Sequence, residues 1–398
     1  MKKIIVLLII FFLFSTIFAK KNQITKIGKD IPITGNIEQL KYFFDALEKT
    51  KNEKIRIAHY GDSIIWGDII TDNLRVYFQK KYGGHGIGFI SLCNDDLSAR
   101  QTIIHKFSDD WSWASVFTKN REHYPIGIAG IVAKAGAKSS VYFESRKVSP
   151  AVDSFSETKL FYSNVSSNAK VKFSIDNKDF KTLRLLATAD KLAVTELYNG
   201  KEAKKINLEF INAKGGFFYG ITLDGGNGIY VDNFSFRGNS GVSLRDINDK
   251  LLPGFASNLN YKLFILQFGV NVAASGNVKY KWYERQMLHV IKKIRKYFPK
   301  SSILIISPGD LGQKKGKKII THPEIKKFVK AQERIATKAQ VAFWNMFQAM
   351  GGNNSITRWV NASPPLAYKD YCHLTWEGGE VISTKLLTAL FKVKSKIK

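Results

Sequence analysis

The stretch that decides the fold is residues 55–63, which read IRIAHYGDS. The first six residues are typical of a strand, and Gly61-Asp62-Ser63 is typical of a tight turn. Residues 68–81 then place apolar side chains at helical spacing, and this pattern ends at Gly83-Gly84. A strand, a turn and a helix in this order predict the first unit of an α/β sheet.

The C-terminal part of the chain repeats this alternation. Residues 263–268 are wholly apolar, as expected for a strand covered on both faces of a parallel sheet. Further predicted strands and helices follow in turn: helix 280–298, strand 302–307, helix 323–339, strand 341–344 and helix 376–392. Together with a helix predicted at 36–50, they indicate an α/β fold of three layers with a parallel sheet.

Residues 137–236 have a different character. Short β-type runs recur there about every 8–12 residues and are separated by turn residues, a spacing typical of a β-sandwich. The alternative is a set of hairpins that extends the main sheet. We expect a separate sandwich, inserted into an α/β domain that comprises residues 20–136 and 237–398.

The N-terminus has the layout of a secretory signal peptide. Lys2 and Lys3 precede an apolar run at residues 4–14, and Ala19 marks the expected cleavage site. An uncleaved membrane anchor is the alternative, although the run is shorter than the about 20 residues that a span needs. We therefore expect residues 1–19 to be removed and the protein to be exported to the periplasm, the cell envelope or the medium.

Composition narrows the classes of partner. The chain of 398 residues has 61 Lys and Arg against 33 Asp and Glu, a formal charge of +28, and its 44% hydrophobic content excludes wholesale disorder. Cleavage of the signal peptide would lower this charge to +26. Such a charge favours an anionic partner, and for an exported protein we expect an acidic envelope surface rather than nucleic acid. A role in solubility alone is the alternative.

Three short motifs carry chemistry. Ser63 lies where a strand of an open α/β sheet ends, which is where active sites of such sheets form. Asp370 and His373 are three residues apart before the last helix, so the carboxylate could orient the imidazole that deprotonates a serine. Asn271, in Gly269-Val270-Asn271, could donate its amide to an oxyanion. Each motif alone is also compatible with a structural turn or a helix cap.

Other reactive side chains have more ordinary interpretations. Cys372 is expected to be a buried thiol rather than a nucleophile, and a Cys93–Cys372 disulfide after export is the alternative. Two cysteines exclude a disulfide scaffold, and the seven histidines show no metal-ligand spacing, so we expect no metal and no cofactor. Trp111 and Trp113 fit either sugar stacking or core packing.

Taken together, Ser63, Asn271, Asp370 and His373 resemble the conserved blocks of SGNH, or GDSL-type, hydrolases. The resemblance assigns Ser63, Asp370 and His373 as the catalytic triad. It places an oxyanion hole at Ser63, Asn271 and a glycine, for which Gly241 is expected and Gly238 is the competitor. The chain further resembles secreted peptidoglycan O-acetylesterases of this group, which carry an inserted jelly-roll module similar to carbohydrate-binding modules.

This resemblance implies a secreted serine esterase that removes O-acetyl groups from an envelope glycan, with acetylated peptidoglycan as the expected substrate. An O-acetyltransferase, or an esterase for another acetylated polysaccharide, would use the same triad. A non-catalytic glycan-binding protein is the alternative from a different class.

Overall fold

The computed structural model describes residues 27–94, 100–149, 151–276 and 278–397. The predicted signal peptide at residues 1–19 lies outside this range. Within the described residues, none of the helices combines the length and the apolar character needed to cross a membrane.

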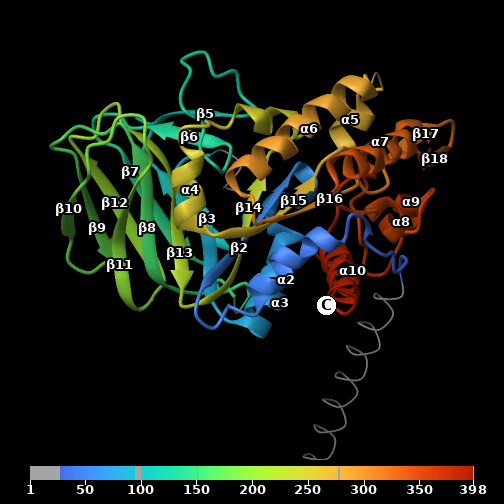
Figure 1. Cartoon of the computed structure of the whole chain (residues 1–398), viewed down its shortest axis with the longest axis horizontal. Helices are drawn as coiled ribbons and strands as arrows, with labels where there is room; N and C mark the ends of the chain where they lie inside the picture. Colours follow the sequence, from blue (N-terminus) through green and yellow to red (C-terminus); the bar gives the residue numbers. More distant parts are fainter. Residues whose placement is uncertain (1–26, 95–99, 150, 277, 398) are drawn as a thin grey trace, which may run out of the picture.

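A six-stranded sheet forms the centre of the α/β part, in the order β1-β19-β16-β15-β2-β14 (Figure 1). All neighbours in it are parallel except the pair of β1 and β19. This confirms the predicted mixed α/β fold with a parallel sheet. The strands span β1 (Thr34–Gly35), β2 (Lys54–Gly61), β14 (Gly228–Ser235), β15 (Tyr261–Gln267), β16 (Ser302–Ile306) and β19 (Ala342–Trp344).

Helices cover both faces of this sheet. Ile55 and Ile57 of β2 pack into a cluster with α2, α3 and α10, whereas Ala58 and Tyr60 pack into a cluster with α4, α6 and α7. The two faces are apolar because a central parallel strand is buried on both sides. The helices span α2 (Lys41–Leu47), α3 (Thr71–Tyr82), α4 (Leu252–Leu259), α5 (Val270–Ala274), α6 (Tyr280–Tyr297), α7 (Pro323–Ala339), α8 (Met346–Ala349), α9 (Ser355–Val360) and α10 (Trp376–Lys394), with 3-10 turns η1 (Glu38–Leu40), η2 (Ser63–Asp68) and η4 (Val242–Asp246).

Two antiparallel sheets lie at the other end of the molecule, at the left of Figure 1. One has the order β10-β9-β12-β7-β4, and the other has the order β11-β8-β13-β6-β5 with β3 paired to β13. Both sheets contribute to one hydrophobic cluster, which includes Phe143, Phe173, Leu160 and Phe218. Their strands span β3 (His85–Ile90), β4 (Ile103–Phe107), β5 (Ser112–Ser115), β6 (Ile131–Lys134), β7 (Ser140–Ser145), β8 (Phe155–Ser163), β9 (Lys170–Ile175), β10 (Lys181–Arg184), β11 (Ala193–Ala203), β12 (Lys205–Ile211) and β13 (Phe217–Gly225); β17 (Gly312–Lys315) and β18 (Lys318–Thr321) form a separate hairpin.

Strand pairing differs from the predicted insert, 137–236, at both ends. Strands β3 to β6 precede residue 137 but pair within the antiparallel sheets, whereas β14 lies beside β2 in the parallel sheet. These early strands give a weak sequence signal, because β3 contains two glycines and β4, β5 and β6 are only four or five residues long. β14 resembles the strands of the insert in sequence because its apolar residues continue the series of β-type runs, but it is buried along almost its whole length beside β2.

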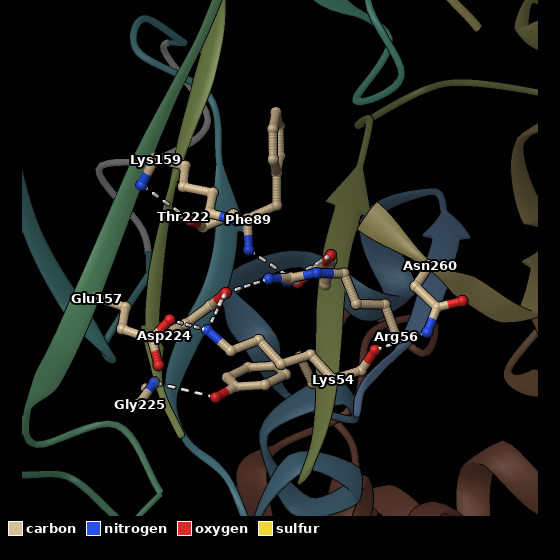
Figure 2. A network of polar contacts seen from close by, with 12 residues as sticks. Lys54, Arg56, Phe89, Glu157, Lys159, Thr222, Asp224, Gly225 and Asn260 are labelled. Carbon is tan, nitrogen blue, oxygen red and sulfur yellow. Dashed lines mark hydrogen bonds and ion pairs between the residues drawn. The ribbon is translucent and has the colours of Figure 1, made fainter. Parts of the chain in front are cut away.

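A buried polar network joins the two parts of the molecule (Figure 2). Arg56 of β2 contacts Asp232 of β14 at 3.2 Å and Asp224 of β13 through its other terminal nitrogen. Asp232 also accepts a hydrogen bond of 2.8 Å from the backbone N–H of Phe89 in β3. Nearby, Lys54 of β2 pairs with Glu157 of β8. The parallel sheet is therefore tied to the antiparallel sheets by charges that are largely withdrawn from water.

His59 is a second buried polar group in β2. Its Nε2 lies 3.0 Å from the Gln267 side-chain oxygen and its Nδ1 lies 3.0 Å from the Thr71 hydroxyl, so the neutral ring donates to one and accepts from the other. Burial lowers the pKa of His59 to about 4, against the smaller opposing effect of the Gln267 hydrogen bond. The folded protein therefore keeps this ring neutral at mildly acidic pH.

This histidine is expected to weaken the fold in acid. Below its unfolded pKa the unfolded chain binds a proton that the folded chain does not, so stability decreases as the pH falls toward the folded pKa. In His59→Gln, we expect the loss of unfolding free energy between about pH 7 and about pH 4.5 to be smaller by roughly 2 kcal/mol, at about 1.4 kcal/mol for each pKa unit. Urea unfolding at both pH values measures this difference. The exposed His289, changed to Gln, is the control, and equal losses in His59→Gln and wild type would contradict the assignment.

Candidate active site

Ser63 lies at the turn that follows the central strand β2. Asp62 is extended (φ −92°, ψ −153°) and its side chain accepts a hydrogen bond from the Ile64 N–H, so the chain enters the 3-10 turn η2 directly at Ser63. Gly61 permits this turn, because a Cβ there would lie 2.7 Å from the Ile65 side chain and 3.0 Å from the Gln267 carbonyl oxygen. The local sequence thus presents Ser63 at the carboxyl edge of the sheet.

His373 and Asp370 reach the same edge from the loop before α10. The His373 Nε2 lies 2.8 Å from the Ser63 hydroxyl oxygen, and its Nδ1 lies 2.7 Å from an oxygen of Asp370. The loop reverses direction at Tyr371, which is left-handed (φ 57°). The His373 and Asp370 side chains are 38% and 48% exposed, so a large substrate can approach them. The structure therefore brings the three predicted triad residues into one hydrogen-bonded chain.

Asp370 is held as a carboxylate. Its second oxygen accepts backbone N–H bonds from Cys372 at 3.0 Å and from His373 at 3.1 Å. Partial burial acts to raise the pKa of Asp370, but the hydrogen bonds from the His373 side chain and from these backbone groups outweigh it and leave the pKa below its usual value. An ionised carboxylate at Nδ1 keeps Nε2 as the nitrogen that accepts the serine proton.

Cys372 is not activated, although it lies between these two residues. Burial raises the pKa of its thiol to about 12, and the nearby Asp62 and Asp370 carboxylates add to the effect. The thiolate, which is the reactive form, is therefore scarce at neutral pH. Both Cys372 and Cys93 are free, so the structure contains no bond between them.

Asp62 is a site residue that the sequence reasoning did not single out. Besides Ile64, it accepts the backbone N–H of Gly269 at 3.1 Å, which fixes the turn of Ser63 against the start of α5, the helix that contains Asn271. Burial raises the pKa of Asp62 to about 6, while its backbone hydrogen bonds act in the opposite direction. The only sequence signal for this role is its place in the Gly-Asp-Ser turn.

The oxyanion-hole glycine expected at Gly241 requires correction. The Gly241 N–H already donates to the Asn239 side chain at 2.6 Å, so it is not available to a substrate. Gly238 instead lines the same cavity as Ser63, His373 and Asn271. The Asn271 amide nitrogen points to the same loop and lies 3.3 Å from the Asn239 carbonyl oxygen. The geometry thus favours the competitor, Gly238.

Two cavities meet at Ser63 and His373. One, of about 560 Å³, extends toward the antiparallel sheets and is lined there by Trp113 and Phe117. The other, of about 410 Å³, runs past the loop before α10 and is lined by Trp66, Tyr368 and Trp376. Arg237 borders both cavities. The sequence left sugar stacking and core packing open for Trp111 and Trp113. Trp113 lines a cavity, as sugar stacking requires, whereas Trp111 is packed in the core against Phe210 and Phe218.

A larger hollow lies away from this chemistry. It measures about 740 Å³ and lies over the sheet of β4, β7, β12, β9 and β10, where Tyr142, Phe180 and Asn207 form part of its wall. Size alone would favour it as the active site, but its lining includes none of the triad residues. The hydrogen-bonded serine and histidine identify the smaller cavities as the place where a reaction can occur.

No family model and no curated protein matches the chain. Among solved structures, a peptidoglycan O-acetylesterase is 21% identical and aligns over 91% of this chain and 99% of its own, with a TM-score of 0.72. An acetyl xylan esterase aligns over 40% of this chain and 81% of its own at 16% identity and a TM-score of 0.30. A family two carbohydrate esterase from Cellvibrio japonicus aligns over 74% of this chain and all of its own at 11% identity and a TM-score of 0.29.

The likeness to the peptidoglycan O-acetylesterase establishes the fold. It extends over almost the whole of both chains. The predicted resemblance to SGNH hydrolases of this kind is therefore confirmed at the level of the fold. Because a fold hosts many activities, the reaction itself has to be argued from the site.

Proposed function

We propose that the protein is an exported serine esterase that removes O-acetyl groups from a cell-envelope glycan, with peptidoglycan as the main substrate. The observation that carries this proposal is the continuous hydrogen-bonded chain from Ser63 through His373 to Asp370. This chain lies at the junction of two cavities that are open to solvent and lined by aromatic side chains.

The reaction proceeds in two steps. The Ser63 oxygen attacks the acetyl carbonyl while His373 Nε2 takes the serine proton, and Asp370 stabilises the resulting imidazolium. The tetrahedral intermediate collapses, the C–O bond to the glycan breaks, and His373 returns the proton to the departing glycan hydroxyl. Water then attacks the acetyl-Ser63 ester while His373 takes its proton, the bond between the acetyl carbon and the Ser63 oxygen breaks, and His373 returns the proton to Ser63 as acetate leaves.

In this mechanism the negative charge on the carbonyl oxygen is held by three donors. They are the backbone N–H groups of Ser63 and Gly238 and the side-chain amide of Asn271. Gly238 replaces Gly241 in this role because the N–H of Gly241 is occupied by Asn239. All three donors border the cavity that contains His373.

Asn271→Ala is expected to lower kcat for p-nitrophenyl acetate by about 10²- to 10³-fold, because one donor to the oxyanion is lost. KM should change little, since the interaction is made mainly in the transition state. Steady-state kinetics measure both constants. Ser275→Ala, at the exposed end of α5, is the matched control. A wild-type kcat in Asn271→Ala would contradict the assignment.

The architecture supports an inserted module beside the catalytic domain. We propose that residues 85–225, which contain strands β3 to β13, form a β-sandwich inserted into the hydrolase chain. Trp113 and Ser115 of β5 come from this part and line the cavity next to Ser63. The module would therefore shape the substrate cavity as well as any separate glycan contact.

The substrate assignment is tested by acetate release. Purified protein is incubated with O-acetylated peptidoglycan and, in parallel, with acetylated xylan, without an added acceptor. We expect faster release from peptidoglycan, and none from Ser63→Ala. Faster acetate release from xylan would indicate that the substrate is a neutral polysaccharide instead. Acetate transfer that requires an added sugar acceptor would identify an acetyltransferase, and binding without any release would indicate a glycan-binding protein.

A further inference from the structure

Arg237 occupies a position that the proposed triad chemistry does not use. It follows β14, which ends at Ser235, and directly precedes Gly238. Arg237 lines both cavities, and the only other residues that line both are Ser63 and His373. A substrate whose acetyl ester lies at Ser63 must therefore pass close to this guanidinium, whichever cavity holds the rest of the glycan.

The guanidinium is held in place by an aromatic ring. Its central carbon lies 4.5 Å from the centre of the Trp66 ring. Trp66 belongs to the turn that begins with Ser63, and its backbone leaves the helical conformation there (φ −59°, ψ 144°). Stacking of this kind orients a guanidinium while leaving its edge available for hydrogen bonds. Arg237 is thus fixed to the same turn as the nucleophile.

Arg237 differs in its partners from the buried arginines. Arg56 and Arg75 are paired with carboxylates of the protein. Across the part of the chain that the structure describes, none of the ion pairs involves Arg237. Asp370, which lines the cavity of about 410 Å³ together with Arg237, is already bonded to His373 and to two backbone N–H groups. The guanidinium of Arg237 is therefore available to bind an anionic group of the substrate beside the reacting ester.

We propose that Arg237 binds a carboxylate of the acetylated glycan and thereby selects acidic over neutral substrates. The inference rests on the esterase function proposed above and names its substrate class. A planar guanidinium with a fixed edge matches a carboxylate in a two-bond geometry. Two sources offer this chemistry in an envelope glycan: an acid carried on the sugar itself, or an acid of a peptide attached to the sugar.

The test compares selectivity in wild type, Arg237→Gln and Arg237→Lys. Four substrates are used: soluble O-acetylated peptidoglycan chains with their peptides, the same chains after an amidase has removed the peptides, acetylated xylan, and p-nitrophenyl acetate. In Arg237→Gln, we expect the ratio of kcat/KM for the acidic chains to that for xylan to fall by about ten- to a hundredfold, the range for a lost hydrogen bond to a charged group. The loss should arise mainly in KM, and lysine should restore part of it.

The two carboxylate sources give different patterns. A fall only on chains with peptides assigns the carboxylate to the peptide, and a fall only on amidase-treated chains assigns it to the sugar. Arg184→Gln, at the exposed edge strand β10, is the matched control and should keep the wild-type ratio.

An unchanged ratio in Arg237→Gln would overturn the inference. The variant's hydrolysis of p-nitrophenyl acetate, if it remains far above that of Ser63→Ala, shows that it is folded and that the esterase proposal survives such a result. If the wild-type protein hydrolyses none of the four substrates, it is the esterase proposal that fails.

Discussion

Ser63→Ala is expected to lower kcat for p-nitrophenyl acetate by about 10⁴- to 10⁶-fold, as in other serine triads that lose the nucleophile. The reason is geometric, because the Ser63 hydroxyl is the group hydrogen-bonded to His373 Nε2, at 2.8 Å. His373→Ala should lose a similar factor, since it removes the base. Steady-state kinetics with purified variants measure both losses.

The double variant gives a sharper result. If Ser63 and His373 act as one unit, Ser63→Ala/His373→Ala should be about as slow as either single variant, rather than showing the product of both losses. Cys372→Ala is the matched control in the same loop. Since the raised pKa of Cys372 leaves its thiol protonated, this variant should retain kcat within about threefold of wild type. A large loss in Cys372→Ala with an active Ser63→Ala would contradict the proposed nucleophile.

Arg56→Met is expected to lower the free energy of unfolding by about 3–5 kcal/mol, the cost of leaving buried charges without their partner. Arg56 is 3% exposed and faces two carboxylates, Asp224 and Asp232, whose side chains are 5% and 0% exposed. Burial raises the pKa of Asp232 despite the opposing effect of Arg56. Removal of the arginine therefore leaves a buried carboxyl group whose ionised form destabilises the folded state. Urea unfolding measures the difference.

Two variants separate the network from a simple loss of packing. Arg184→Met, on an exposed edge strand, should stay within about 0.5 kcal/mol of wild type. The addition of Asp232→Asn to Arg56→Met should recover part of the lost stability, because it removes the buried charge of Asp232, whereas Asp224 keeps Lys54 at 3.8 Å. Equal stabilities of Arg56→Met and Arg184→Met would show that the network of Figure 2 contributes little to the fold.

The main sheet and the triad could be predicted from the sequence because their signals are local. The apolar strand before Gly61-Asp62-Ser63 and the run at residues 263–268 each indicate a buried parallel strand without reference to the rest of the chain. Asp370 and His373 are close in the sequence, so one loop conformation suffices to bring them together. The contact between His373 and Ser63 then follows from the shared carboxyl edge of the sheet.

Other features depend on contacts between distant segments and left no local signal. Gly238 and Gly241 lie in one loop, and the N–H of Gly241 donates a hydrogen bond to the Asn239 side chain. The spacing of residues in the sequence does not indicate this hydrogen bond. The stack of Arg237 on Trp66 joins the end of β14 to the nucleophile turn. The start of the antiparallel sheets at β3 gives no local signal for a similar reason, since this strand is defined by its pairing with β13 rather than by its composition.

The most direct test of the central claim is covalent labelling of the nucleophile. The wild-type protein is treated with a fluorophosphonate probe, digested, and mapped by mass spectrometry while residual hydrolysis of p-nitrophenyl acetate is followed. We expect one phosphonyl group on Ser63, loss of activity in proportion to the label, and no labelling at this site in His373→Ala over the same time. A label on another residue that accounts for the loss of activity, or full activity with Ser63 modified, would contradict the proposed mechanism.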